Sequence, residues 1–104
     1  MAKMIYVVKS RFPHTDHDYW CGYKTLSNAK RAARSDAQSG YKVTVIKVGN
    51  PYETVGGGRE FETRIIIGKS RGNGKMRWRF DRDDDTWFYD SVPMSVLEAI
   101  EKEL

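Results

Sequence analysis

The dipeptide Asn73-Gly74 separates two segments with the side-chain pattern of β-strands, and it is the strongest constraint on the fold. Asn-Gly favours the tight turn of a β-hairpin, because both residues tolerate a positive φ. Residues 61–69 before it are rich in β-branched side chains, and residues 75–80 after it alternate strictly between basic and apolar. We therefore expect an antiparallel hairpin there.

The rest of the chain predicts an α+β fold in the order β-β-α-β-β-β-β-α. We expect one domain over residues 1–104, with a mostly antiparallel, twisted sheet and both helices packed on one of its faces. Besides the hairpin, the expected strands are residues 4–9, 18–24, 41–48 and 86–90. A long loop with three consecutive glycines is expected over residues 49–60.

Two segments have the apolar spacing of helices. The first begins at Thr25 or Ser27, either of which can cap it, and stops at Gly40. Its apolar face is mostly alanine, which lets a helix lie close to a sheet; the residues are Leu26, Ala29, Ala33 and Ala37. The second is expected to run to the end of the chain, with Ser95 and Glu98 as a capping box. Its apolar stripe comprises Val96, Leu97, Ile100 and Leu104.

Charge is unevenly distributed along the chain. The formal net charge is +4, but residues 1–82 are basic and residues 83–104 are acidic. This asymmetry favours an anionic partner. No apolar stretch approaches the length of a membrane span, no secretory signal is evident, and the lone Cys21 has no partner for an internal disulfide. We therefore expect a cytoplasmic protein that does not enter membranes.

The predicted hairpin has the best candidate surface for function. Basic residues at 75, 77 and 79 alternate with apolar ones, so a strand would gather positive charge on one face. The first helix adds a second basic patch. The candidate nucleic-acid contacts are Lys30, Arg31, Arg34, Arg64, Lys69, Arg71, Lys75, Arg77 and Arg79. The alternative is an ordinary strand whose basic residues discourage aggregation. Whether the two patches share a surface depends on which sheet face the helix covers, and the sequence leaves this open.

Metal and catalytic motifs are weak. His14, His17 and Cys21 have side chains that suit zinc, but their spacing is not that of a paired ligand set. The aspartates of residues 81–85 lack the glycine and glutamate of a calcium loop, and Gly56-Gly57-Gly58 lacks the Lys-Ser/Thr of a phosphate loop. We expect no metal, no cofactor and a binding rather than an enzymatic role.

The first half of the chain resembles small bacteriophage accessory proteins. The resemblance lies in the pattern of Ile5–Lys9, Tyr19–Leu26, Ala29–Ala33 and Gly40–Val43. It implies no specific activity, but such proteins often bind a host enzyme or nucleic acid. A protein-binding inhibitor or adaptor of a host enzyme is therefore the alternative function, with Tyr52, Trp87 or Tyr89 as its aromatic anchors.

The predicted first hairpin is also similar to that of the GIY-YIG nucleases. Ile5-Tyr6 and Trp20-Cys21-Gly22 fall at a comparable spacing, and Arg31 follows on the next helix. The chain departs from the motif at Met4, which replaces its first glycine, and at Trp20 and Cys21, which replace tyrosine and isoleucine. This resemblance implies a metal-dependent nuclease and is the third hypothesis.

Overall fold

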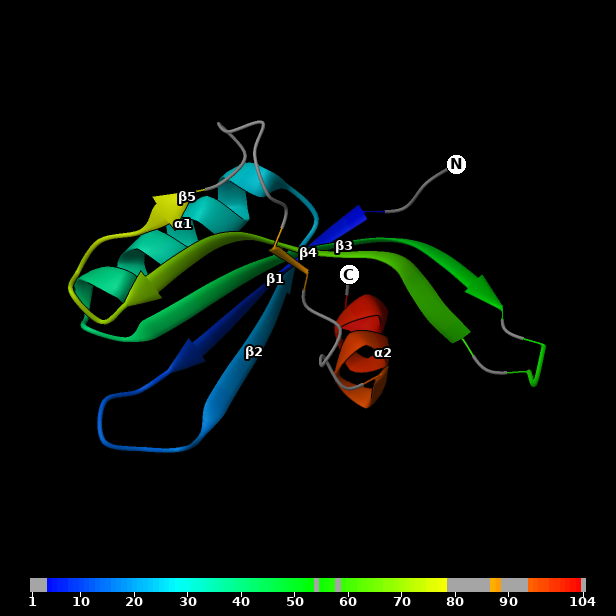
Figure 1. Cartoon of the computed structure of the whole chain (residues 1–104), viewed down its shortest axis with the longest axis horizontal. Coiled ribbons are helices and arrows are strands. Elements are labelled where there is room, and N and C mark those ends of the chain that lie inside the picture. Colours follow the sequence, from blue (N-terminus) through cyan, green and yellow to red (C-terminus); the bar gives the residue numbers. More distant parts are fainter. Residues whose placement is uncertain (1–3, 54, 58, 79–86, 89–93, 104) are drawn as a thin grey trace.

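The computed structural model describes residues 4–53, 55–57, 59–78, 87–88 and 94–103. Its elements follow the expected β-β-α-β-β-β-β-α order (Figure 1). They are β1 (Met4–Arg11), β2 (Asp18–Tyr23), α1 (Leu26–Gln38), β3 (Lys42–Glu53), β4 (Arg59–Arg71), β5 (Arg77–Trp78), β6 (Trp87–Phe88) and α2 (Met94–Glu103). The α+β prediction is confirmed.

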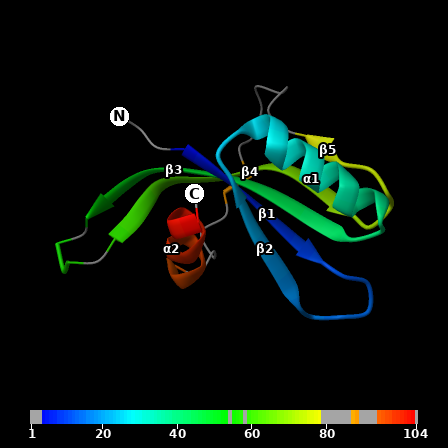
Figure 2. The ribbon, with the colours of Figure 1, turned by 180° about the vertical axis from the view of Figure 1, so that it is seen from behind.

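All six strands join one antiparallel sheet. Its order is β2-β1-β3-β4-β5, and β6 also pairs with β4. β5 and β6 occupy the same edge of β4 at different positions, because Trp78 lies opposite Gly68 whereas Phe88 lies opposite Ile65. The long ribbon of β3 and β4 is therefore the centre of the sheet, and it extends beyond both helices in Figures 1 and 2.

The two helices lie on opposite faces of this sheet, so the expectation that both pack on one face is wrong. Val7 belongs to the core cluster that contains Leu97 and Ile100 of α2, whereas the next residue, Val8, belongs to the cluster of α1. Successive side chains of a strand point to opposite faces, so the two clusters are on opposite sides. In both views α1 lies above β3 and α2 lies below it (Figures 1 and 2).

A β-bulge in β4, opposite β3, changes the faces to which the β4 side chains point, whereas the side chains of β3 alternate regularly between the two cores. The register with β4 shifts between Val45 and Ile46. Val45 is buried in the α1 cluster, and Ile46 and Val48 are buried in the α2 cluster. The extra residue on the partner strand is Ile67, which packs with α1. Ile67 and Gly68 therefore both lie on the α1 face, and Lys69 lies on the opposite face.

The first helix forms as the sequence predicts. Thr25 is its N-cap, and the Thr25 hydroxyl oxygen accepts a hydrogen bond from the backbone N–H of Asn28 at 3.3 Å. Gly40 follows its end with a φ of 87°, a conformation that glycine adopts without steric cost. The helix is fixed to β1 by a hydrogen bond of 2.6 Å, in which the buried Ser10 hydroxyl donates to Asp36. Its buried residues are Ala29, Ala33 and Ala37.

The segment of residues 49–60 and the start of the last helix differ most from the expectation. The loop predicted over residues 49–60 is mostly strand, since β3 continues to Glu53 and β4 begins at Arg59. Pro51 lies opposite Phe61 in this ladder, so tertiary pairing overrides the local turn signal. The last helix begins at Met94, which places Ser95 inside its first turn rather than at its cap. Within the described residues, no helix is long and apolar enough to cross a membrane.

Candidate nucleic-acid interface

Basic side chains gather on the half of the sheet face that α2 leaves uncovered in the described part of the chain. We call this surface the basic sheet face and define it by seven cations. They are Lys9, Arg11, Lys42, Lys69, Arg71, Lys75 and Arg77. These side chains line a shallow hollow of about 820 Å³ together with Thr44 and Asn73, and no described lining residue is acidic. The hollow can therefore accept an anionic ligand.

Strand register arranges these cations in two rows that cross the strands. In the first row, Lys42 lies opposite Arg11 on one side and opposite Arg71 on the other. The second row contains Lys9, Thr44, Lys69 and Arg77, each opposite the next across neighbouring strands. Directly opposite residues share a face and lie about 4.5–5.5 Å apart at Cβ. The rows thus place like charges side by side.

The predicted basic hairpin supplies part of this face. Lys75 and Arg77 are exposed, while Met76 and Trp78 pack against the α1 cluster, so the expected alternation is confirmed over these four residues. Arg79, the third predicted basic residue, lies outside the described residues.

The hairpin connection is wider than a two-residue Asn-Gly turn. β4 ends at Arg71 and β5 begins at Arg77, so five residues connect the strands. Gly72 and Gly74 have φ values of 89° and 83°, and the side-chain oxygen of Asn73 accepts a hydrogen bond from the Lys75 backbone N–H at 3.2 Å. The glycine conformations and the asparagine hydrogen bond that are typical of a tight turn are therefore present, but they belong to a five-residue loop.

Arg64 lies apart from the basic sheet face. It is opposite the buried Val48, in the half of the face where the α2 core packs. The buried Ile66 separates it from Lys69 along β4. Arg64 therefore does not join the other hairpin residues with which the sequence analysis grouped it.

The helical basic patch is on the opposite side of the sheet. Lys30, Arg31 and Arg34 line a separate surface of α1, and α1 covers the face of Val8 and Val43. Lys30 is half-buried, and its ammonium lies 5.5 Å from the centre of the Trp78 ring. The question that the sequence left open has a clear answer: the two patches do not share a surface.

Three cations of the basic sheet face were missed by sequence reasoning. Lys9, Arg11 and Lys42 come from β1 and β3, and only the register brings them beside β4. A signal was present in β1, because Lys9 and Arg11 alternate with the buried Val8 and Ser10. The same alternation identified the basic residues of the hairpin.

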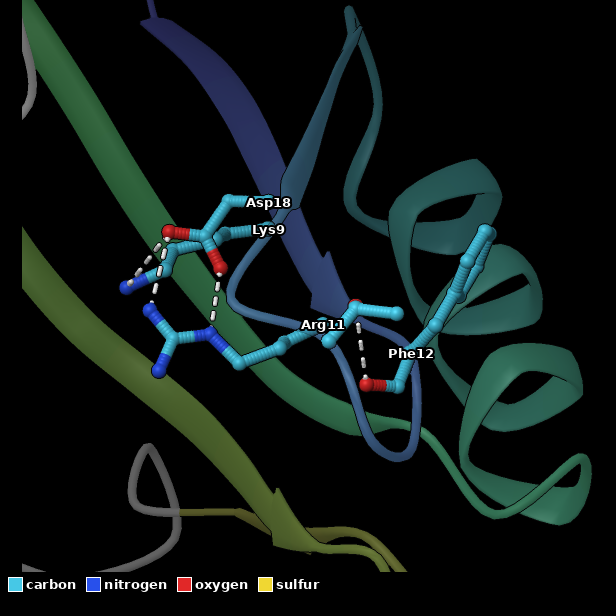
Figure 3. Close-up of polar contacts among 5 residues, drawn as sticks. Lys9, Arg11, Phe12 and Asp18 are labelled. Carbon is cyan, nitrogen blue, oxygen red and sulfur yellow. Dashed lines mark hydrogen bonds and ion pairs between the residues drawn. The ribbon is translucent and has the colours of Figure 1, made fainter.

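One carboxylate is bound to this face at its edge. Asp18 accepts hydrogen bonds from Arg11 at 2.8 Å and 3.2 Å, and it lies 3.8 Å from the ammonium of Lys9 (Figure 3). The hydrogen bond from Arg11 lowers the pKa of Asp18 below its ordinary value of 3.8; burial opposes this, and the nearby charges of Lys9, Arg11 and His17 add to the lowering. Asp18 is therefore an anion at neutral pH.

The other candidate sites remain unsupported by geometry. In the described part of the chain, no three His, Cys, Asp or Glu side chains gather as metal ligands would. Cys21 is exposed on the edge strand β2. The aspartates of residues 81–85 and Tyr89 lie outside the described residues, as do the side chains of Tyr52 and Trp87.

Comparison with known proteins indicates no function for this chain. Searches of the chain against protein-family models, curated proteins and solved structures return no match. The functional conclusion therefore depends on the residues of the basic sheet face.

Proposed function

We propose that this protein binds nucleic acid by contacting backbone phosphates with the basic sheet face. The observation that carries the proposal is the opposition of like charges in the first row, where Lys42 lies between Arg11 and Arg71. Like charges directly opposite each other in a sheet are destabilising. A bound polyanion would offset this destabilisation.

The dimensions of the face suit a phosphate backbone. The second row crosses four neighbouring strands from Lys9 to Arg77. With strands about 4.8 Å apart, it spans about 15 Å. One strand of a duplex advances about 3.4 Å for each phosphate along the axis, so several phosphates fall within this span. The face would thus contact a backbone rather than a single phosphate group.

The chemistry of the face favours binding without sequence preference. Most of its described polar groups are lysine and arginine, which contact phosphates strongly. Such contacts fix the position of a protein on nucleic acid but do not read the base sequence. The uncharged polar residues that line the hollow are Thr44, Ser70 and Asn73. We therefore expect affinity to vary little among sequences of the same length.

A titration over a series of salt concentrations tests this function. A short fluorescently labelled duplex is titrated with the protein, and the logarithm of the binding constant is plotted against the logarithm of the salt concentration. Phosphate contacts release counterions, so we expect a straight line with a slope of about −3 or steeper. Weak binding that scarcely depends on salt would reject the proposal and favour the protein-binding alternative. Incubation of the duplex with Mg²⁺ in the same samples tests the nuclease hypothesis by the appearance of cleavage products.

A further inference from the structure

Asp18 holds two cations of the basic sheet face in place. It begins β2, directly opposite Arg11 in β1. Its two carboxylate oxygens accept hydrogen bonds from Nε and Nη2 of Arg11, and one of them also faces the Lys9 ammonium (Figure 3). Two parallel bonds between a guanidinium and a carboxylate fix both groups in one plane.

The carboxylate lies outside the hollow that these cations line. The side chain of Arg11 is 41% exposed, whereas those of Asp18 and Lys9 are 21% and 19% exposed. Lys9 and Arg11 line the hollow of the basic sheet face, and Asp18 is not among its lining residues. A ligand in the hollow would therefore meet the two cations first.

Charge repulsion acts among these cations, and the contact with Asp18 opposes it. Arg11 lies opposite Lys42, and Lys9 is on the same strand face two residues from Arg11. Arginine and lysine side chains are long and lose much rotamer freedom when they are fixed. The bidentate contact supplies that ordering before any ligand arrives, and ordering in advance raises affinity.

We propose that Asp18 is a positioning residue that orients Arg11 and Lys9 toward phosphates, so that its loss weakens nucleic-acid binding although it adds a positive charge. This inference rests on the proposed function. If Asp18 acted only through its charge, its replacement would raise the affinity, because removing an anion from a basic surface strengthens polyanion binding. The two roles therefore predict opposite changes in binding affinity.

The test compares Asp18→Asn with Asp16→Asn. Asp16 is exposed in the loop that leads into β2. Both variants gain the same charge, but only Asp18→Asn loses the contact with Arg11. In duplex titrations at one salt concentration, Asp16→Asn should bind as tightly as the wild type or slightly more tightly. Asp18→Asn should bind about threefold or more weakly than Asp16→Asn. Equal or tighter binding by Asp18→Asn would overturn the inference.

A second variant and a spectroscopic signal distinguish this inference from the function on which it rests. Asp18→Glu keeps the carboxylate, and it should bind more tightly than Asp18→Asn if the contact positions Arg11. The NMR signal of the Arg11 Nε–H should be protected from solvent exchange in the wild type and in Asp16→Asn, and it should lose that protection in Asp18→Asn. Unchanged protection in Asp18→Asn would overturn the inference whatever the affinities. Absence of binding by the wild type would reject the proposed function, and the positioning role with it.

Discussion

Trp78 of β5 covers Gly68 of β4 so closely that a methyl group on Gly68 would have no space. The two residues lie opposite each other in the ladder, and a Cβ built at Gly68 would be 2.5 Å from the Trp78 ring. Gly68 does not have a positive φ, so the constraint is one of packing rather than of backbone conformation. This contact fixes the side of β5 that faces α1 and thereby turns Lys75 and Arg77 toward the basic sheet face.

Gly68→Ala should therefore destabilise the fold. The added methyl group must displace a ring that packs against the α1 cluster, and such overpacking typically costs about 1–3 kcal/mol. Gly56→Ala is the matched control, since no atom of the described residues lies within 4 Å of the added methyl group there. Urea unfolding should show a lower midpoint for Gly68→Ala alone. Equal midpoints for the two variants would mean that the close packing of Trp78 on Gly68 is not maintained in solution.

Trp78→Ala should lower the free energy of unfolding by about 2–3 kcal/mol. This is less than the range of about 3–5 kcal/mol for a fully buried tryptophan, because the ring is only half-buried. Arg77→Ala changes the exposed neighbour and should alter stability by less than about 0.5 kcal/mol. Thermal or denaturant unfolding of both variants checks this contrast. A larger loss from Arg77→Ala would contradict the assignment of the two faces of β5.

The contact between Asp18 and Arg11 predicts a pH dependence of stability. The pKa of Asp18 is below 3.8 in the folded state, so its contribution to stability is fully present above that value and is lost as the pH falls through the lowered pKa. Asp18→Asn should therefore be less stable than the wild type at pH 7, by about 1 kcal/mol. The difference should disappear in strong acid. A difference that persists unchanged at low pH would show that the Asp18 charge is not responsible.

The sequence predicted the elements well and their assembly only in part. Local signals predicted three features correctly. These are the alternation around Trp78, the cap at Thr25 and the buried alanines of α1. The consecutive apolar pairs Val7-Val8 and Val45-Ile46 indicate strands buried on both faces, which is why one-sided helix packing was wrong.

The candidate site depends on register, which local patterns do not specify. Lys42 has no distinguishing neighbour in the sequence, yet it lies between Arg11 and Arg71 in the sheet. The separation of the α1 patch from the hairpin has the same origin, because it follows from the face that α1 covers. Residues far apart in the chain thus form the surface, and only the strand pairing identifies them.

Two charge-matched double variants test the central claim most directly. Lys42→Gln/Arg71→Gln removes two opposed cations from the basic sheet face, and Arg31→Gln/Arg34→Gln removes two exposed cations from α1 on the other side. The salt dependence of duplex binding is measured for both. If the basic sheet face binds the backbone, the first pair flattens the slope by about 1.8, or 0.9 for each lost phosphate contact, and the second pair leaves it unchanged. Equal effects of the two pairs, or a larger effect of the helical pair, would contradict the account.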